Sequence, residues 1–310
     1  IKTRFQKCEY AIYSNRLSSI IEKQEWPFCT PGYWNEDMTT ISQHPKSGRV
    51  IKVLQITDTH LFASSSGCLL GLNTEQSLLA VIAAIRASQL PADLILATGD
   101  LVHDGTAVAY RRIFDHLENF GLPVYCLPGN HDEARSLQQS LGDGPLKYTS
   151  HAHHGNWHFI FLDSTIPDSE AANLSPETLQ TLETLLQSAP TDHTLVCLHH
   201  QPVLMGSRWL DTMAVDNRDE FLALIDRYPQ VRGILWGHVH QQFDGMHNNV
   251  RLMASPSTCV QFLPHSEDFA VDTATPGYRW LELHPDGRIE TGVERIAALP
   301  GEIDMASCGY

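Results

Sequence analysis

Five short clusters of Asp, Asn, His and Gly stand along the chain, each directly after an apolar run. They are Asp58-Thr59-His60, Gly99-Asp100, Gly129-Asn130-His131-Asp132, His199-His200 and Gly237-His238-Val239-His240. Carboxylate, amide and imidazole groups suit borderline divalent ions such as iron, manganese or zinc, and the lack of Cys argues against a structural zinc site. One such cluster is weak support for a metal site, but an ordered series of them predicts a shared centre.

The spacing within the clusters would allow neighbouring residues to bind the same metal ion. In an extended segment, Asp58 and His60 would point to the same side, so both could reach one ion. A Gly before Asp100, Asn130 and His238 allows a sharp turn or a close backbone approach at each position. Two ions about 3.5–4 Å apart can share a bridging carboxylate, activate a bridging hydroxide and neutralise a phosphate group. The predicted chemistry is therefore metal-dependent phosphoester hydrolysis.

The segments around the clusters predict the elements that position them. Strands are expected at residues 50–57, 93–98, 123–128, 157–163, 194–199 and 231–237, with further short strands after residue 250. Helices are expected after a cap at Asn73, over residues 107–120, after the Ser175-Pro176 cap and near residues 219–228. Alternating strands and helices indicate an α/β fold, in which ligands gather at the carboxyl ends of the strands.

The chain shows no internal linker and is interpreted as one domain. We expect an irregular N-terminal extension at residues 1–48, a single domain at 49–296 and a C-terminal tail at 297–310. Met38 is a candidate true start. N-terminal sequencing of naturally produced protein that found residues before Met38 would exclude it.

The charge and hydrophobicity of the chain indicate which binding partners and surroundings it suits. The 310 residues include 21 Lys and Arg against 36 Asp and Glu, a formal net charge of −15 that disfavours long nucleic acid. No apolar run is long enough for a transmembrane helix, and the first residues lack the apolar core of a secretory signal. Cys126, Cys197 and Cys259 lie in or beside apolar runs and are expected as buried, reduced thiols in a cytoplasmic protein.

As an ordered set within residues 53–240, the clusters resemble the calcineurin-like metallophosphoesterase superfamily. The resemblance implies a four-layer α/β/β/α sandwich with the site at one edge of its sheets. It also implies two divalent metal ions, Fe²⁺ or Mn²⁺ with Zn²⁺ as an alternative. One metal would be bound by Asp58, His60 and His240, Asp100 would bridge, and the other would be bound by Asn130, His199 and His238.

Residues 54–62, 97–105, 127–132, 237–241, 256–262 and 275–287 resemble bacterial class III cyclic-AMP phosphodiesterases more closely. That resemblance implies hydrolysis of 3′,5′-cyclic AMP to 5′-AMP, with a small cyclic nucleotide as partner and no membrane association. His131 would be the general acid, and Asn130, His131 and His60 would contact the substrate. The oligomeric state is open, with a homodimer as one candidate.

Several points stay open at this level. Many relatives place an Asp three residues after the bridging Asp100, where this chain has His103, so Asp104 is a candidate to orient His131 instead. His199 is preferred to His200 as a ligand because it comes first after its strand, but the choice is not secure. The alternatives are a metallophosphoesterase for another small phosphodiester, such as a glycerophosphodiester or nucleotide metabolite, and a non-catalytic scaffold of the same fold.

Other polar or aromatic residues have simpler interpretations. Ser164 lacks the glycine elbow of a nucleophile and is interpreted as structural. Trp236 is expected in the core, and His153-His154 on a surface turn. For the segment Arg208, Trp209 and Asp211, substrate contact and a solvent-facing loop are equally favoured. The segment after Asp100 also lacks the signature of the protein phosphatases.

Overall fold

A computed structural model describes residues 48–142 and 144–309, all of which belong to one unit, Met38–Tyr310. The predicted irregular extension, apart from its last residue, and the candidate start at Met38 lie outside the described residues. Within the described ranges no helix has the length and hydrophobicity to cross a membrane.

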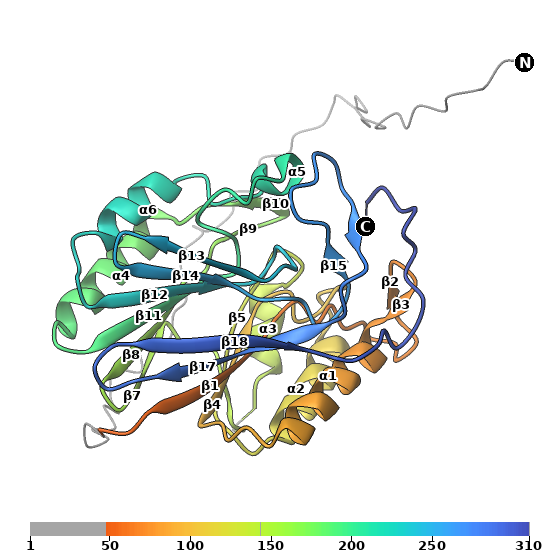
Figure 1. Cartoon of the computed structure of the whole chain (residues 1–310), viewed down its shortest axis with the longest axis horizontal. Coiled ribbons are helices and arrows are strands. Elements are labelled where there is room, and N and C mark those ends of the chain that lie inside the picture. The colour runs from red at the N-terminus through yellow and green to blue at the C-terminus, as the bar shows by residue number, and fades with distance from the viewer. Residues whose placement is uncertain (1–47, 143, 310) are drawn as a thin grey trace, which may run out of the picture. The chain divides into compact units, whose positions relative to one another are not determined.

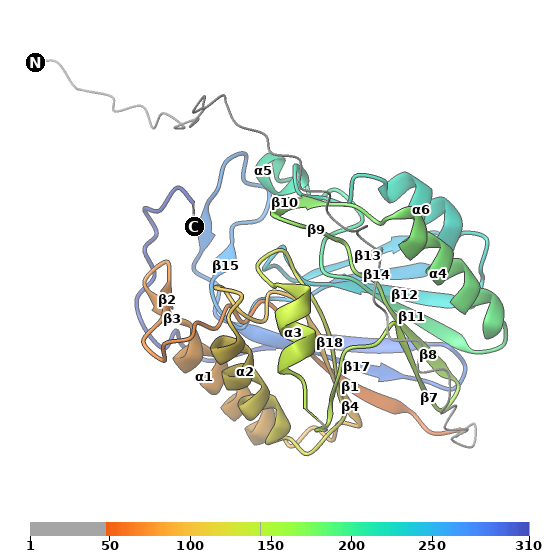
Figure 2. The ribbon, with the colours of Figure 1, turned by 180° about the vertical axis from the view of Figure 1, so that it is seen from behind.

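Two six-stranded sheets form the centre of the fold (Figures 1 and 2). The first has the order β18-β17-β1-β4-β5-β6, in which β1, β4, β5 and β6 are parallel. Its strands are β1 (Ile51–Ile56), β4 (Leu94–Thr98), β5 (Val124–Leu127), β6 (Leu146–Lys147), β17 (Gly277–Leu283) and β18 (Ile289–Arg295).

The second sheet has the order β13-β14-β12-β11-β8-β7. Strands β8, β11, β12 and β14 run parallel, whereas β7 and β13 pair antiparallel at its two edges. Its strands are β7 (His151–His154), β8 (Trp157–Phe161), β11 (His193–Cys197), β12 (Val231–Trp236), β13 (Phe243–His247) and β14 (Val250–Ala254).

Three short two-stranded sheets lie within the loops of the described chain. They are β2 (Cys68–Leu69) with β3 (Leu72–Asn73), β9 (Thr165–Ile166) with β10 (Ser169–Ala172), and β15 (Gln261–Phe262) with β16 (Val271–Asp272). Near the C-terminus, the N–H of Asp304 donates to Leu70 O at 2.8 Å, so the segment that follows β18 returns to the β2–β3 pair.

Helices cover the outer face of each sheet, which gives the predicted α/β/β/α sandwich. Helices α1 (Thr74–Ser88) and α2 (Ala107–Glu118) pack on the first sheet, and α4 (Pro176–Ser188) and α6 (Arg218–Ile225) pack on the second. Two shorter helices, α3 (Ala134–Ser140) and α5 (Arg208–Asp211), complete the set in the described chain. A third apolar cluster, which includes Phe159, Leu195 and Leu281, fills the space between the sheets.

Local sequence signals account for where helices α1 and α4 begin. The Asn73 side chain accepts from the N–H of Gln76, and Ser175 caps α4 before Pro176, as predicted. Helix α3 was not predicted, because its cap is Glu133, whose carboxylate accepts from Arg135 N and Ser136 N, and Glu is outside the usual set of N-cap residues.

One expectation is wrong. His153 and His154 do not lie on a surface turn but in β7, which pairs with β8 at the edge of the second sheet. The run His151–His154 carries three His and no β-branched residue, so its strand character comes from pairing with the apolar β8 rather than from its own propensity. Trp236 is fully buried, as expected.

Arg279 connects the two sheets through a buried hydrogen-bond network. It lies in β17 of the first sheet, and its guanidinium donates to Ala254 O at 2.7 Å and to Phe243 O at 3.0 Å, both in the second sheet. It also pairs with the Asp244 carboxylate at 3.1 Å. Because its side chain is fully buried, removing the guanidinium would leave several acceptors in both sheets without a donor.

We therefore expect Arg279→Met to lower the free energy of unfolding by about 3 kcal/mol, since breaking a buried ion pair leaves uncompensated polar groups. Urea denaturation followed by circular dichroism measures the change. The matched control is Arg288→Met. Arg288 forms an exposed ion pair with Glu290 in the same β17–β18 hairpin, and such pairs contribute less than about 1 kcal/mol. Equal losses for the two variants would contradict the proposed role of Arg279.

Candidate metal centre

The five predicted clusters meet at the carboxyl ends of parallel strands from both sheets. They follow β1, β4 and β5 in the first sheet and β11 and β12 in the second. The loops are also hydrogen-bonded to one another. Asp58 N donates to Gly99 O at 3.0 Å, and Gly237 N donates to His199 O at 3.1 Å. The position of each cluster is therefore fixed by its neighbour as well as by its own strand.

Asp58, His60 and His240 form one fully buried group of ligand atoms. His240 Nε2 lies 3.3 Å from Asp58 Oδ1 and 3.2 Å from His60 Nε2. The other ring nitrogen of His240 is 2.8 Å from Val260 O, which places the proton on Nδ1 and directs the Nε2 lone pair into the group.

Asp100 lies between this group and a second one. Its Oδ2 atom is 3.7 Å from His60 Nε2 on one side and 3.3 Å from His199 Nε2 on the other. His199 Nδ1 is 2.9 Å from Thr98 O, so Nε2 is again the nitrogen directed inward. Asp58, Asp100 and His199 also form a group with mutually close ligand atoms. This intermediate position is the one that a bridging carboxylate requires.

Several buried atoms in this region lack a hydrogen-bond partner within the described chain. They are Asp100 Oδ2, Asn130 Oδ1, His199 Nε2, His200 Nε2 and both ring nitrogens of His238. An unpaired buried polar atom costs about 1–3 kcal/mol, so native structures rarely contain several together. All of them are metal-ligating atom types, and bound divalent ions would satisfy them. The residues present therefore fit a metal centre.

The electrostatics of the group also favour a bound cation. Burial opposes charge on both Asp100 and His199, yet their mutual attraction holds the pKa of Asp100 well below its usual range and raises that of His199 to about 9. The carboxylate field is thus strong enough to hold a positive charge at His199. Burial, followed by neighbouring imidazoles, lowers the pKa of His238, which keeps that ring in its neutral, ligating form.

The backbone of the centre adopts an unfavourable conformation at many ligand positions. Five of the predicted ligands have positive φ angles between 45° and 61°: Asp58, His60, Asp100, His238 and His240. The expectation that Asp58 and His60 converge because they lie in an extended segment is therefore wrong. They converge through left-handed turns, a conformation that costs non-Gly residues roughly 1–3 kcal/mol each and occurs mainly at functional sites.

Glycines make the close approach of these loops feasible. Gly99 has a φ of +91°, and a Cβ there would meet the His199 ring. Gly129 has an ordinary φ, but a Cβ would collide with the Asp100 carboxylate. The predicted reason for the glycines holds for both residues, through a turn at Gly99 and through close packing at Gly129.

Asp132 anchors two of the loops, a role that the sequence analysis missed. Its carboxylate accepts hydrogen bonds from Gly129 N at 2.9 Å, Leu101 N at 3.1 Å and Val102 N at 3.2 Å, and from the Tyr110 hydroxyl at 3.0 Å. Burial, then the nearby Asp100, raises its pKa to about 7. Its place two residues after Asn130 was the available signal, but no local pattern indicates which loop its carboxylate contacts.

The segment at residues 256–262 supports the centre from the second sheet. Ser257 Oγ donates to Asp58 O at 2.7 Å, and Thr258 N donates to Thr57 O at 3.2 Å. Phe262 stacks on the His240 ring with centroids 4.2 Å apart. This segment was part of the resemblance, but only the structure assigns it a physical task.

His131 lies at the edge of the centre. Its N–H donates to Asp100 Oδ1 at 2.9 Å, and its ring stacks on His103, with centroids 4.7 Å apart. Asp104 does not take the orienting position considered for it. Its carboxylate oxygens instead accept from Ala63 N at 2.9 Å and from the Thr106 hydroxyl at 2.8 Å. Two other rings lie against His131: His103, stacked on it, and His60, edge-on with centroids 4.9 Å apart.

His200 is also buried beside the centre, but it points differently from His199. Its Nδ1 atom lies 2.9 Å from Ser164 Oγ, which gives Ser164 the structural role expected of it. Its ring also packs on His238, with centroids 4.6 Å apart.

The segment that follows His200 makes contacts within its own loop and with residues 262–268. Arg208 forms exposed ion pairs with Glu267 and Asp268, and Trp209 packs on Phe262. Asp211 accepts hydrogen bonds from the backbone N–H groups of Met205 and Gly206. These contacts serve the loop structure.

Cys126, Cys197 and Cys259 are buried free thiols, as predicted.

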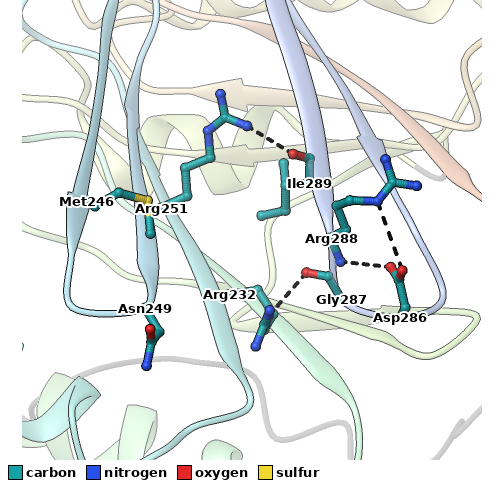
Figure 3. Close-up of a pocket in the computed structure, with 8 residues that line it drawn as sticks. All are labelled: Arg232, Met246, Asn249, Arg251, Asp286, Gly287, Arg288 and Ile289. Atoms are coloured by element: carbon teal, nitrogen blue, oxygen red, sulfur yellow. Dashed lines mark hydrogen bonds and ion pairs between the residues drawn. The ribbon is translucent and has the colours of Figure 1, made fainter.

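A separate hollow of about 440 Å³ opens at the other end of the second sheet (Figure 3). It lies beside the start of β12, five or more residues before the carboxyl end that carries His238. Arg232 donates to Gly287 O at 3.1 Å and Arg251 to Ile289 O at 2.9 Å, so both guanidinium groups are already engaged. The hollow is not part of the metal centre.

Comparisons with known proteins agree with this geometry. The profile of the calcineurin-like phosphoesterase family matches residues 51–242. A 3′,5′-cyclic adenosine monophosphate phosphodiesterase of Vibrio vulnificus, CpdA, is 42% identical over 274 residues, covering 88% of this chain and 100% of the relative. The protein of the same name from Escherichia coli K12 is 42% identical over 275 residues, with the same coverage. A 3′,5′-cyclic-nucleotide phosphodiesterase of Nostoc is 41% identical and covers 79% of this chain and 92% of its own length.

Solved structures show the same fold at low sequence identity. A purple acid phosphatase from yellow lupin superposes with a TM-score of 0.61 at 13% identity, covering 86% of this chain and 56% of the lupin chain. A dimetal phosphatase from Danio rerio superposes with a TM-score of 0.51 at 15% identity, covering 80% of this chain and 100% of the other. The sequence profile, the relatives and the shared fold lead to one conclusion: this chain is a member of the calcineurin-like phosphoesterase family.

Proposed function

We propose that this protein is a metal-dependent phosphodiesterase that hydrolyses 3′,5′-cyclic AMP to 5′-AMP. The observation that carries the proposal is the 42% identity, over the full length of the relative, to proteins named as phosphodiesterases for that nucleotide. The complete set of predicted ligand types at the centre supports catalysis and disfavours the non-catalytic scaffold. We assign this activity to a domain at residues 49–296. A cytoplasmic location stays a prediction.

We assign one metal to Asp58, His60 and His240, the bridge to Asp100, and the other metal to Asn130, His199 and His238. The ions are proposed to be Fe²⁺ or Mn²⁺, because mixed carboxylate, amide and imidazole ligands suit such borderline metals. When bound, a dinuclear centre supplies Lewis acidity and a water of lowered pKa as nucleophile.

The remaining steps fall to the residues of the chain. Asn130, His131 and His60 are our candidates to contact the phosphate group. Cleavage of the bond between phosphorus and O3′ leaves negative charge on the departing oxygen, which must take up a proton. His131 is our candidate donor, held at the centre by the hydrogen bond from its own N–H to Asp100. The stacked ring of His103 restricts its orientation.

The substrate proposal is tested by incubating purified protein, reconstituted with Fe²⁺ or Mn²⁺, with cyclic AMP, cyclic GMP, 2′,3′-cyclic AMP and bis(p-nitrophenyl) phosphate. We expect rapid, chelator-sensitive formation of 5′-AMP, because the centre provides both nucleophile and charge neutralisation. Turnover of the nitrophenyl ester alone would contradict the proposed substrate and favour another small phosphodiester, such as a glycerophosphodiester.

The role of His131 is tested by His131→Ala. Loss of a general acid should reduce kcat for cyclic AMP roughly 100- to 10,000-fold. A substrate with a good leaving group, such as bis(p-nitrophenyl) phosphate, should be affected much less, because its departing oxygen needs little protonation. Metal content and circular dichroism control for the fold. Unchanged cyclic AMP turnover in the folded, metal-loaded variant would rule out the acid role.

The choice between His199 and His200 is tested by metal analysis of two neighbouring alanine variants. Both rings are bonded through Nδ1, to Thr98 in His199 and to Ser164 in His200, which leaves Nε2 of each to bind a metal. His199 Nε2 lies 3.3 Å from Asp100 Oδ2 and forms a group with Asp58 and Asp100, whereas His200 forms a group with His199 and His238. We therefore expect His199→Ala to lose about one of the two metal equivalents and His200→Ala to keep both, since two-metal sites depend on each ligand. Elemental mass spectrometry measures the metal content. Loss of one metal in His200→Ala but not in His199→Ala would make His200 the ligand.

A further inference from the structure

A second group of His lies on the β7–β8 hairpin, outside the centre described above. His151 and His153 are two apart in β7, so their side chains share one face of the sheet. His158 in β8 is directly opposite His153 in the antiparallel register. The rings of His153 and His158 stack with centroids 4.1 Å apart, and that of His151 lies 5.5 Å from His158.

His158 is the unusual member of the group. Its side chain is fully buried, and neither ring nitrogen has a hydrogen-bond partner in the part of the chain that the structure describes. A neutral imidazole must carry one N–H and one lone pair, so this burial leaves both a donor and an acceptor unsatisfied. Such groups cost about 1–3 kcal/mol each and call for an explanation such as a bound ion.

The three rings can converge on one ion. One ligand nitrogen from each of His151, His153 and His158 lies within 4.8 Å of the other two. Tetrahedral zinc with nitrogen ligands at about 2.0–2.1 Å needs ligand nitrogens about 3.3 Å apart. His151 and His153 are exposed at the sheet edge and can rotate toward the buried His158 to close this difference.

The charges around the group suit a cation. The Asp192 carboxylate lies 3.4 Å from His153 Nδ1, the arrangement in which a carboxylate orients a metal-binding imidazole through its other nitrogen.

We propose that His151, His153 and His158 form a second metal site that binds one Zn²⁺ ion, with Asp192 orienting His153. Three imidazole nitrogens are a ligand set that zinc takes in proteins, with tetrahedral geometry. Nothing in this site depends on the proposed phosphodiesterase function.

The site is separate from the candidate metal centre. His158 lies near the start of β8, whereas Ser164, which contacts His200, lies six residues further on, beyond the carboxyl end of the strand. At about 3.3 Å per residue, that separation is on the order of 15–20 Å. Figures 1 and 2 show β7 as the outermost strand of its sheet. A bound ion would clamp this edge strand to β8.

The test compares zinc content in three full-length proteins: wild type, His151→Ala/His153→Ala, and the control His247→Ala. His247 is a strand His paired with Asp226 at 3.0 Å and resembles His153 in that respect. Each protein is loaded with Mn²⁺, equilibrated with Zn²⁺, separated from free metal and analysed for both elements. We expect wild type and control to retain one zinc per chain more than the double variant.

The difference between proteins is the readout, because zinc that enters the catalytic centre contributes equally to all three. Unchanged circular dichroism and phosphoesterase turnover would show that the double variant is intact. Should that variant not fold, His151→Ala alone is expected to weaken zinc binding at least tenfold. Equal zinc content and equal affinity in variants and wild type would overturn the proposal.

Discussion

The Asp58 carboxylate accepts hydrogen bonds from the backbone N–H of His238 at 3.0 and 3.1 Å, and this contact joins a loop of the first sheet to a loop of the second. Asp100 makes the equivalent contact within the first sheet, where its Oδ1 accepts from His131 N at 2.9 Å. Both carboxylates are fully buried. Each one therefore holds the loop that carries other ligands and at the same time directs negative charge into the centre.

Because these carboxylates must be held in place, much of the fold supports the edge of the sheets that carries the candidate centre. The loops bear candidate ligands with positive φ angles, and they are held in place by hydrogen bonds to the Asp132 carboxylate and from the Ser257 hydroxyl. The two sheets are held together by the apolar layer between them and by the hydrogen bonds of the Arg279 guanidinium. Strain at a site persists only where the surroundings over-determine it, and here two packed sheets provide that support.

The two groups of His in this chain differ in their chemistry. The candidate catalytic centre combines two buried carboxylates with imidazoles, so two divalent ions bound there would keep a net positive charge that could attract a phosphate group. The β7–β8 group has imidazoles only, with Asp192 beside one of them. Ligand composition therefore separates a hydrolytic centre from a site suited to a single zinc ion.

The sequence by itself determined the order of the strands and clusters along the chain, the α/β class and the candidate metal-ligating residues. Local signals were sufficient for these, because apolar periodicity and caps such as Asn73 and Ser175 act over a few residues. The family resemblance added the sandwich architecture and the expected reaction.

Only the tertiary structure decided which atoms meet. The anchoring role of Asp132, the stacking of His103 on His131 and the position of His153 in an edge strand all depend on contacts between distant segments. Left-handed turns at Asp58 and His60 are likewise imposed by packing, since neither residue favours them locally. His199 and His200 are adjacent residues of one type, and only the fold gives them different neighbours: Thr98 and Asp100 for His199, Ser164 for His200.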